Sequence, residues 1–64
     1  MPIIRVEMFE GRDRSQKAKI AKALTDAFIE TAGGNPAGVT IRFTDASKED
    51  WAVGGTLVAD RDRS

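Results

Sequence analysis

Hydrophobic and polar positions divide the chain into a strand, a helix and a second strand. The first run, residues 2–9 (PIIRVEMF), is rich in β-branched and aromatic side chains and is closed by Gly11, which predicts a β-strand. Its apolar residues fall on both faces. This pattern is typical of a strand that is covered on both sides or that forms an interface.

The next segment has the start, the periodicity and the end of a helix. Asp13, followed three residues later by Gln16, has the form of a capping box, and Gly33 with Gly34 supplies the stop, so the helix is predicted to run from Asp13 to about Ala32. Apolar side chains recur at spacings of three and four, at Ile20, Leu24, Ala27 and Phe28. One helix face is therefore expected to pack on a sheet.

A second strand is predicted after the turn at residues 35–36. Residues 39–45 (VTIRFTD) alternate, with apolar side chains on one face and Thr40, Arg42 and Thr44 on the other. Strand, helix and strand together predict a β-α-β unit with parallel strands and a right-handed crossover. The fold class is thus α/β (or α+β), as one domain over residues 1–64.

The C-terminal tail, residues 47–59, is predicted to form a hairpin and an arm over a neighbouring subunit. It carries Trp51, the pair Gly54-Gly55 and a short β-type run at residues 56–58. Sixty-four residues without cysteine have no disulfides and bury only about 60% of their unfolded surface, so oligomerisation is the remaining means of stabilisation. Two such units are expected to join edge to edge into a four-stranded sheet.

Composition excludes several classes of function. Ten basic and ten acidic residues cancel and are scattered, which argues against a nucleic-acid partner. The chain has neither histidine nor cysteine, so no metal site is expected. No apolar run approaches the roughly 20 residues that span a bilayer, so no membrane partner is expected, and the expected location is the cytoplasm.

The residue behind the initiator methionine is Pro2. Removal of Met1 would leave Pro2 with a free secondary amine, and retention of Met1 would abolish that group. An α-amino group titrates at about 7.7–8.0, and an apolar pocket or a neighbouring cation lowers its pKa towards neutrality. A general base works best near the operating pH, so Pro2 is the candidate catalytic residue.

Two further side chains are candidates for a site. Arg12 follows the first strand and offers a planar fork for a carboxylate, as well as a charge that lowers the pKa of a neighbouring amine; the alternative is a solvated surface arginine. Trp51 is the only tryptophan and lies in a glycine-flanked turn region. It is interpreted either as the wall of a pocket or as interface packing, and the two roles are compatible.

Several of these features occur together in one known family. The opening Pro-Ile-Ile-x-Val, the triplet at residues 10–12 (EGR), the helix of about twenty residues, the strand at residues 39–41 (VTI) and the segment 51–55 (WAVGG) resemble the 4-oxalocrotonate tautomerase family over nearly the whole chain. The resemblance implies a hexamer, a trimer of dimers. It also implies keto-enol isomerisation without cofactors, and a place in the degradation of aromatic compounds.

By the same resemblance, Pro2 is the general base, Arg12 binds a substrate carboxylate and Trp51 is the aromatic pocket wall. The implied substrate is a 2-hydroxymuconate-type dienol or an unsaturated 2-oxo acid. Family members usually carry a second arginine on the second strand, where this chain has Thr40. Loss of one strong electrostatic donor costs on the order of 10²–10³ in turnover. Arg42 lies on the same face, about 6.6 Å further along the strand, and Arg5 is another candidate cation.

Three explanations of Thr40 stay open. In the first, the chain is a tautomerase with a rearranged cation, and Arg42 is a substrate-binding residue. In the second, the reaction is of a hydratase or dehalogenase type. In the third, the chain is one subunit of a hetero-hexamer whose paralogous partner brings the arginine. A non-catalytic subunit of an oligomer is the alternative from another class of function. A homo-hexamer and a hetero-hexamer are both compatible with the sequence.

Overall fold

The computed structural model describes residues 2–61 of the chain. The elements, in order, are β1 (Ile3–Phe9), α1 (Arg14–Ala32), η1 (Pro36–Gly38), β2 (Thr40–Ala46), η2 (Lys48–Asp50), β3 (Ala52–Val53), β4 (Thr56–Leu57) and α2 (Val58–Arg61). The predicted strand–helix–strand order and the C-terminal hairpin are confirmed. The second strand is shifted by one residue from its predicted bounds, which is the usual uncertainty at element ends.

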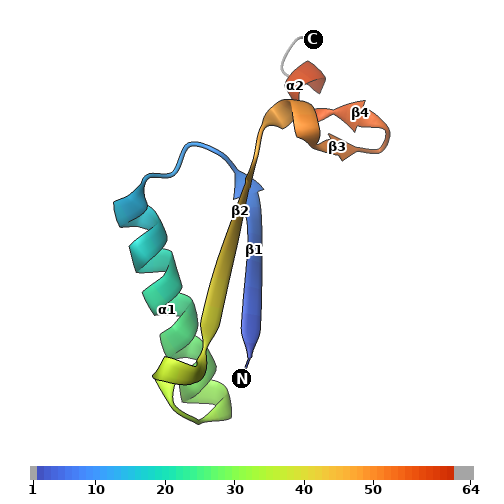
Figure 1. The fold of residues 1–64 in the computed structure, drawn as a ribbon. Helices are drawn as coiled ribbons and strands as arrows, with labels where there is room; N and C mark the ends of the chain where they lie inside the picture. The colour runs from blue at the N-terminus through green and yellow to red at the C-terminus, as the bar shows by residue number, and fades with distance from the viewer. Residues whose placement is uncertain (1, 62–64) are drawn as a thin grey trace.

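Strands β1 and β2 are parallel neighbours, paired in register from Ile3 opposite Thr40 to Phe9 opposite Ala46. Burial alternates along both strands, as a pleated sheet with one covered face requires. The half-buried face carries Ile4, Val6, Met8, Ile41 and Phe43. Helix α1 lies along this side of the sheet (Figure 1), and the other face is free of helices.

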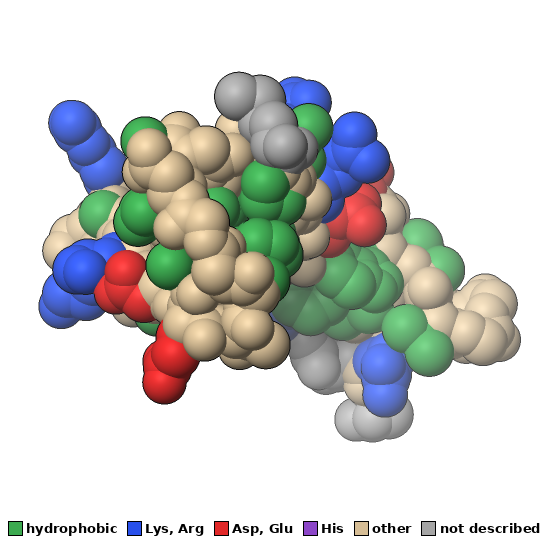
Figure 2. Space-filling model, turned by 90° about the horizontal axis from the view of Figure 1, so that it is seen from below, with side chains coloured by type: hydrophobic (Ala, Val, Ile, Leu, Met, Phe, Trp, Pro, Cys, Tyr) green, Lys and Arg blue, Asp and Glu red, His purple; other side chains and the backbone are tan. Residues whose placement is uncertain are grey.

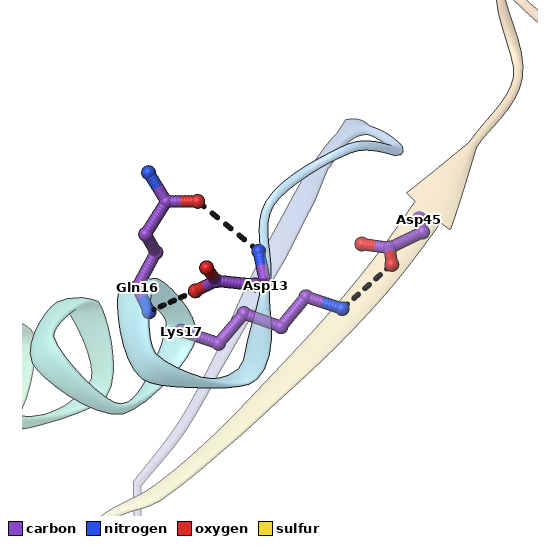
Figure 3. Close-up of polar contacts among 4 residues, drawn as sticks. All are labelled: Asp13, Gln16, Lys17 and Asp45. Atoms are coloured by element: carbon purple, nitrogen blue, oxygen red, sulfur yellow. Dashed lines mark hydrogen bonds and ion pairs between the residues drawn. The ribbon is translucent and has the colours of Figure 1, made fainter.

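The ends of α1 are built as the sequence predicts. The Asp13 carboxylate accepts a hydrogen bond from the Gln16 backbone N–H at 2.8 Å, and the Gln16 side-chain oxygen accepts one from the Asp13 N–H at 3.1 Å (Figure 3). This capping box satisfies two of the N–H groups that a helix start leaves without partners. At the other end the N–H of Gly33, at φ 79°, donates to the Ile29 carbonyl at 2.8 Å.

One ion pair joins the helix to the sheet. Lys17 Nζ lies 2.6 Å from Asp45 Oδ2, connecting the first turn of α1 to the end of β2 (Figure 3). The two side chains are 28% and 35% exposed, which makes this contact more sheltered than the pair between Lys22 and Asp26 on the helix surface. Twenty-eight residues separate its members, so no local spacing in the sequence indicates it.

The hairpin of β3 and β4 turns at Gly54 and Gly55. Its antiparallel pairs are Ala52 with Leu57 and Val53 with Thr56. The two glycines have φ of 63° and 87°, and positive φ at both central residues is the pattern of a type I′ turn, which favours glycine. In Figure 1 the hairpin and α2 extend beyond the ends of β1 and β2 rather than folding back onto them.

The isolated chain has no closed core. None of the residues 2–61 is fully buried, and Ile3 and Val53 are each 54% exposed. The Cα radius of gyration is 15.2 Å, whereas a compact chain of this length has about 11 Å. The accessible surface of 5091 Å² is roughly a quarter larger than a compact 6.9 kDa protein presents. Figure 2 shows hydrophobic side chains reaching the surface between the charged ones.

No helix within residues 2–61 is long and apolar enough to cross a membrane.

Candidate functional site

Pro2 lies directly before β1 and is half-buried. Its carbonyl accepts a hydrogen bond from the Thr40 N–H at 3.0 Å, which continues the β1–β2 ladder by one step beyond Ile3. The bond fixes the backbone of Pro2 against the start of β2. Thr40 is therefore beside Pro2 in space. This is the position at which the resemblance to the tautomerase family predicts a second arginine.

Arg42 lies on the helix-free face of the sheet, two residues along β2 from Thr40. The residue paired with it on β1 is Arg5, so two exposed guanidinium groups stand on neighbouring strands. Neither forms an ion pair with any residue between 2 and 61. Like charges directly opposite each other destabilise a sheet, and an anion bound between the two guanidinium groups would offset this repulsion.

Arg12 and Trp51 lie at the other end of the sheet from Pro2. The ring of Trp51 contacts that of Phe9, at the end of β1, with centroids 4.4 Å apart and an interplanar angle of 53°. Arg12 is three residues beyond Phe9 and exposed. Because β1 spans seven residues at about 3.3 Å each, on the order of 20 Å separates Pro2 from this end. A single chain therefore does not bring Pro2 and Arg12 together.

Beside Trp51 is a hollow of about 280 Å³. It is lined by Glu7, Thr44, Ala46, Asp50, Trp51 and Ala52. Trp51 forms one wall of this hollow, and its role in a substrate pocket stays a prediction. The carboxylates of Glu7 and Asp50 make the hollow acidic. Sequence reasoning missed these two as site residues, because they are far apart in the chain. They meet only once Glu7 on β1 pairs with Thr44 on β2, the strand that leads to Asp50 in η2.

Within the described residues, no group of three or more acidic side chains is placed to hold a metal ion. What the residues offer is an N-terminal proline at one end of the sheet, and an arginine with an aromatic wall at the other. These groups suit the binding and proton transfer of a small carboxylate, provided that the two ends are brought together.

One protein family matches the chain over nearly its whole length. The family model described as "Tautomerase enzyme" matches residues 2–61. A probable tautomerase of Ralstonia nicotianae is 39% identical over 57 residues, covering 89% of this chain and 88% of its own.

Two solved structures have the same fold. TomN, a 4-oxalocrotonate tautomerase homologue of the tomaymycin biosynthetic pathway, superposes with a TM-score of 0.93 at 40% identity, covering 98% of this chain and 97% of its own. A heterohexamer 4-oxalocrotonate tautomerase from Chloroflexus aurantiacus gives a TM-score of 0.86 at 33% identity, covering 94% of this chain and 97% of its own. With its β-α-β unit, its C-terminal hairpin and a family match that begins at Pro2, the chain belongs to the tautomerase family.

Proposed function

We propose that the protein is a cofactor-independent isomerase that uses the Pro2 amine as general base on a 2-hydroxymuconate-type dienol or an unsaturated 2-oxo acid. The observation that carries the proposal is the position of Pro2, half-buried and tied through its carbonyl to Thr40 at the start of the sheet. A backbone held in this way keeps the amine in one place, and positioning of the reacting groups lowers the barrier.

The proposed reaction moves one proton and consumes no other reagent. The neutral amine of Pro2, present once Met1 is removed, takes a proton from one position of the substrate. The resulting ammonium returns it to a carbon at another position of the conjugated system. Arg12 holds a carboxylate of the substrate, and Trp51 excludes water from the pocket, which favours the neutral amine by lowering its pKa.

The proposed assembly is a hexamer built as a trimer of dimers, because one chain separates Pro2 from Arg12 and Trp51. The exposed apolar side chains Ile3, Val53 and Leu57 give such an assembly surface to bury. At least two copies must then contribute to each site.

A hetero-hexamer is the second candidate, and Thr40 is the observation that favours it. A threonine beside Pro2 supplies no cation for the developing negative charge. A paralogous subunit carrying an arginine at that position would complete the site, in the manner of an assembly from two kinds of chain. The similar protein from Chloroflexus aurantiacus is described as a heterohexamer.

The test compares the two prolines of the chain, Pro2 and Pro36. Intact mass first establishes the loss of Met1, and ketonisation of 2-hydroxymuconate is then followed by ultraviolet absorbance. Pro2→Ala keeps an amine but makes it primary, and we expect turnover to fall by roughly 10²-fold or more, within the range of a lost general base. Pro36→Ala, in the turn η1, is the matched control and should retain activity.

Retained Met1, or full activity in Pro2→Ala, would contradict the role of Pro2. Activity that appears only after a paralogous subunit is added would select the hetero-hexamer over the homo-hexamer.

A further inference from the structure

Two arginines stand side by side on the helix-free face of the sheet. Arg5 on β1 and Arg42 on β2 are register partners, and neighbouring strands lie about 4.8 Å apart. Both residues are exposed, and neither makes an ion pair with any residue between 2 and 61. Like charges directly opposite each other are destabilising, so the pair costs stability unless a negative charge compensates it.

The face itself does not supply that compensation. The carboxylate in the next row is Glu7, which lies opposite Thr44 and forms no ion pair with either arginine. Glu7 lines the hollow beside Trp51 instead. Two arginines against one glutamate leave this face of β1 and β2 with an excess of positive charge, which attracts anions.

Hydroxyl groups flank the arginines along β2. Thr40 and Thr44 lie two residues before and two residues after Arg42, so the three side chains share one face at steps of about 6.6 Å. Both threonines are exposed, and neither hydroxyl makes a hydrogen bond with a described residue. A hydroxyl can donate one hydrogen bond. Arg5, Arg42 and the two threonines, together called the arginine patch, thus combine two guanidinium forks with two hydroxyl donors.

The charge and the donors of the arginine patch select the kind of anion. Two guanidinium groups are neutralised by two negative charges, whereas one carboxylate supplies a single charge. A phosphate group carries about −1.5 to −2 near pH 7 and presents three strong acceptor oxygens on one compact group. Arginine forks bind pairs of such oxygens bidentately. A phosphate group therefore matches the patch better than a carboxylate does.

We propose that Arg5 and Arg42, with the flanking threonines, form a binding site for a phosphate group, carried either by inorganic phosphate or by a phosphate monoester. The site goes beyond the proposed isomerase reaction and does not rest on it, because it needs neither the Pro2 amine nor the loss of Met1. Arg12, which holds the substrate carboxylate in the proposed reaction, follows the end of β1 and is not part of the patch.

Isothermal titration calorimetry of the assembled protein measures the binding. Inorganic phosphate, glycerol 3-phosphate and malonate are titrated in turn at one fixed ionic strength, so that general screening of charge is equal for all three. We expect both phosphates to bind saturably, and malonate to bind on the order of 10-fold more weakly because its two charges are on separate groups. Tighter binding of glycerol 3-phosphate identifies a monoester as the ligand, and tighter binding of inorganic phosphate identifies the free ion.

Absence of saturable binding for both phosphates would overturn the site. Malonate that binds more tightly than either phosphate would overturn the assignment of the ligand.

The two arginines are tested by removing one guanidinium at a time. Arg5→Gln and Arg42→Gln should each raise the dissociation constant for inorganic phosphate on the order of 10-fold or more, as expected when hydrogen bonds to a charged group are lost. Arg14→Gln, at an exposed arginine at the start of α1, changes the net charge equally and is the matched control. Equal weakening in all three variants would show that phosphate responds only to net charge, which contradicts a site.

The repulsion between the arginines gives a second test. In phosphate-free buffer we expect Arg5→Gln and Arg42→Gln to raise the melting temperature, because each removes the contact between like charges. With saturating phosphate the original protein gains stability through binding, and the two variants gain little. Variants that melt below the original protein in phosphate-free buffer would show that there is no repulsion for an anion to relieve, and would count against the site.

Neither test uses catalysis, and phosphate should bind to Pro2→Ala as tightly as to the original protein. Intact phosphate binding in a protein without activity on 2-hydroxymuconate would count against the proposed reaction and not against the site. Activity on 2-hydroxymuconate without phosphate binding would count against the site alone.

Discussion

Beside Pro2 the side chain at position 40 carries no charge, and the next cation on that face of β2 is Arg42. Both strand positions point away from α1, so they share one surface. A guanidinium two residues along a strand starts about 6.6 Å away, and the long arginine side chain spans a distance of that order. Arg42 is therefore the residue at which a rearranged cation is best tested.

We predict that Arg42→Ala lowers kcat on 2-hydroxymuconate by roughly 10²-fold, as expected when one electrostatic donor is lost. Arg42→Lys keeps the charge and should lose less. Adding Thr40→Arg to Arg42→Ala should restore activity, because it places a cation beside Pro2. Steady-state kinetics on assembled protein are the measurement. Equal activity in the original protein and in Arg42→Ala would assign the missing cation elsewhere.

Among the elements, α1 depends on local chemistry more than any other. Its first turn is held locally by the Asp13–Gln16 capping box, and the long-range ion pair between Lys17 and Asp45 joins that turn to β2. On the solvent side, Lys22 Nζ donates a hydrogen bond to the Asp26 carboxylate, and this bond raises the pKa of Lys22 above its ordinary 10.5. The stabilisation from that pair is complete below pH 10.5 and is lost only as the pH rises through the raised value, so it is constant near neutrality.

We predict that Asp13→Ala lowers the free energy of unfolding by about 1 kcal/mol for each subunit, the usual cost of removing an N-cap. Ser15→Ala, in the same turn, is the control because its side chain makes no hydrogen bond with a described residue. Urea denaturation at one fixed protein concentration compares the two. A loss of equal size in both variants would show that the capping box contributes nothing of its own.

As a whole molecule, the chain is an extended unit that lacks a closed interior. Its dimensions are 47 × 25 × 15 Å, and none of its described side chains is fully buried. The free energy of burying apolar side chains, about 25 cal/mol for each Å², is therefore largely unrealised in one copy. We expect contact with other copies to supply further stability to a chain without disulfides.

We predict that folding and assembly are linked, so that the melting temperature rises with protein concentration. Differential scanning calorimetry between micromolar and millimolar concentrations is the measurement. A melting temperature independent of concentration would mean that the single chain is stable alone, contrary to this expectation.

The two main strands, the long helix and the hairpin were predictable from residues close together in the chain, whereas the helix α2, where a β-type run to Val58 was predicted, was not. Asp13 with Gln16, Gly33 after the helix, and the glycine pair at 54–55 each act through hydrogen bonds or φ angles within a few residues, and all three predictions hold in the structure. The parallel pairing of the strands follows from the length of the helix between them, which must cross back over the sheet. Pro2, Arg12 and Trp51 were selected from the sequence as candidate site residues, and their roles stay predictions.

The distances between the candidate site residues were decided by the tertiary structure alone. A strand of seven residues is rigid and extended, so it holds Pro2 and Arg12 at opposite ends, although the two are only ten residues apart in the sequence. The contact of Lys17 with Asp45, and the meeting of Glu7 with Asp50 around one hollow, depend on register between segments far apart in the chain. Local propensity determines which elements form, whereas side-chain packing and strand pairing determine which residues meet, because those energies exist only once the elements are in contact.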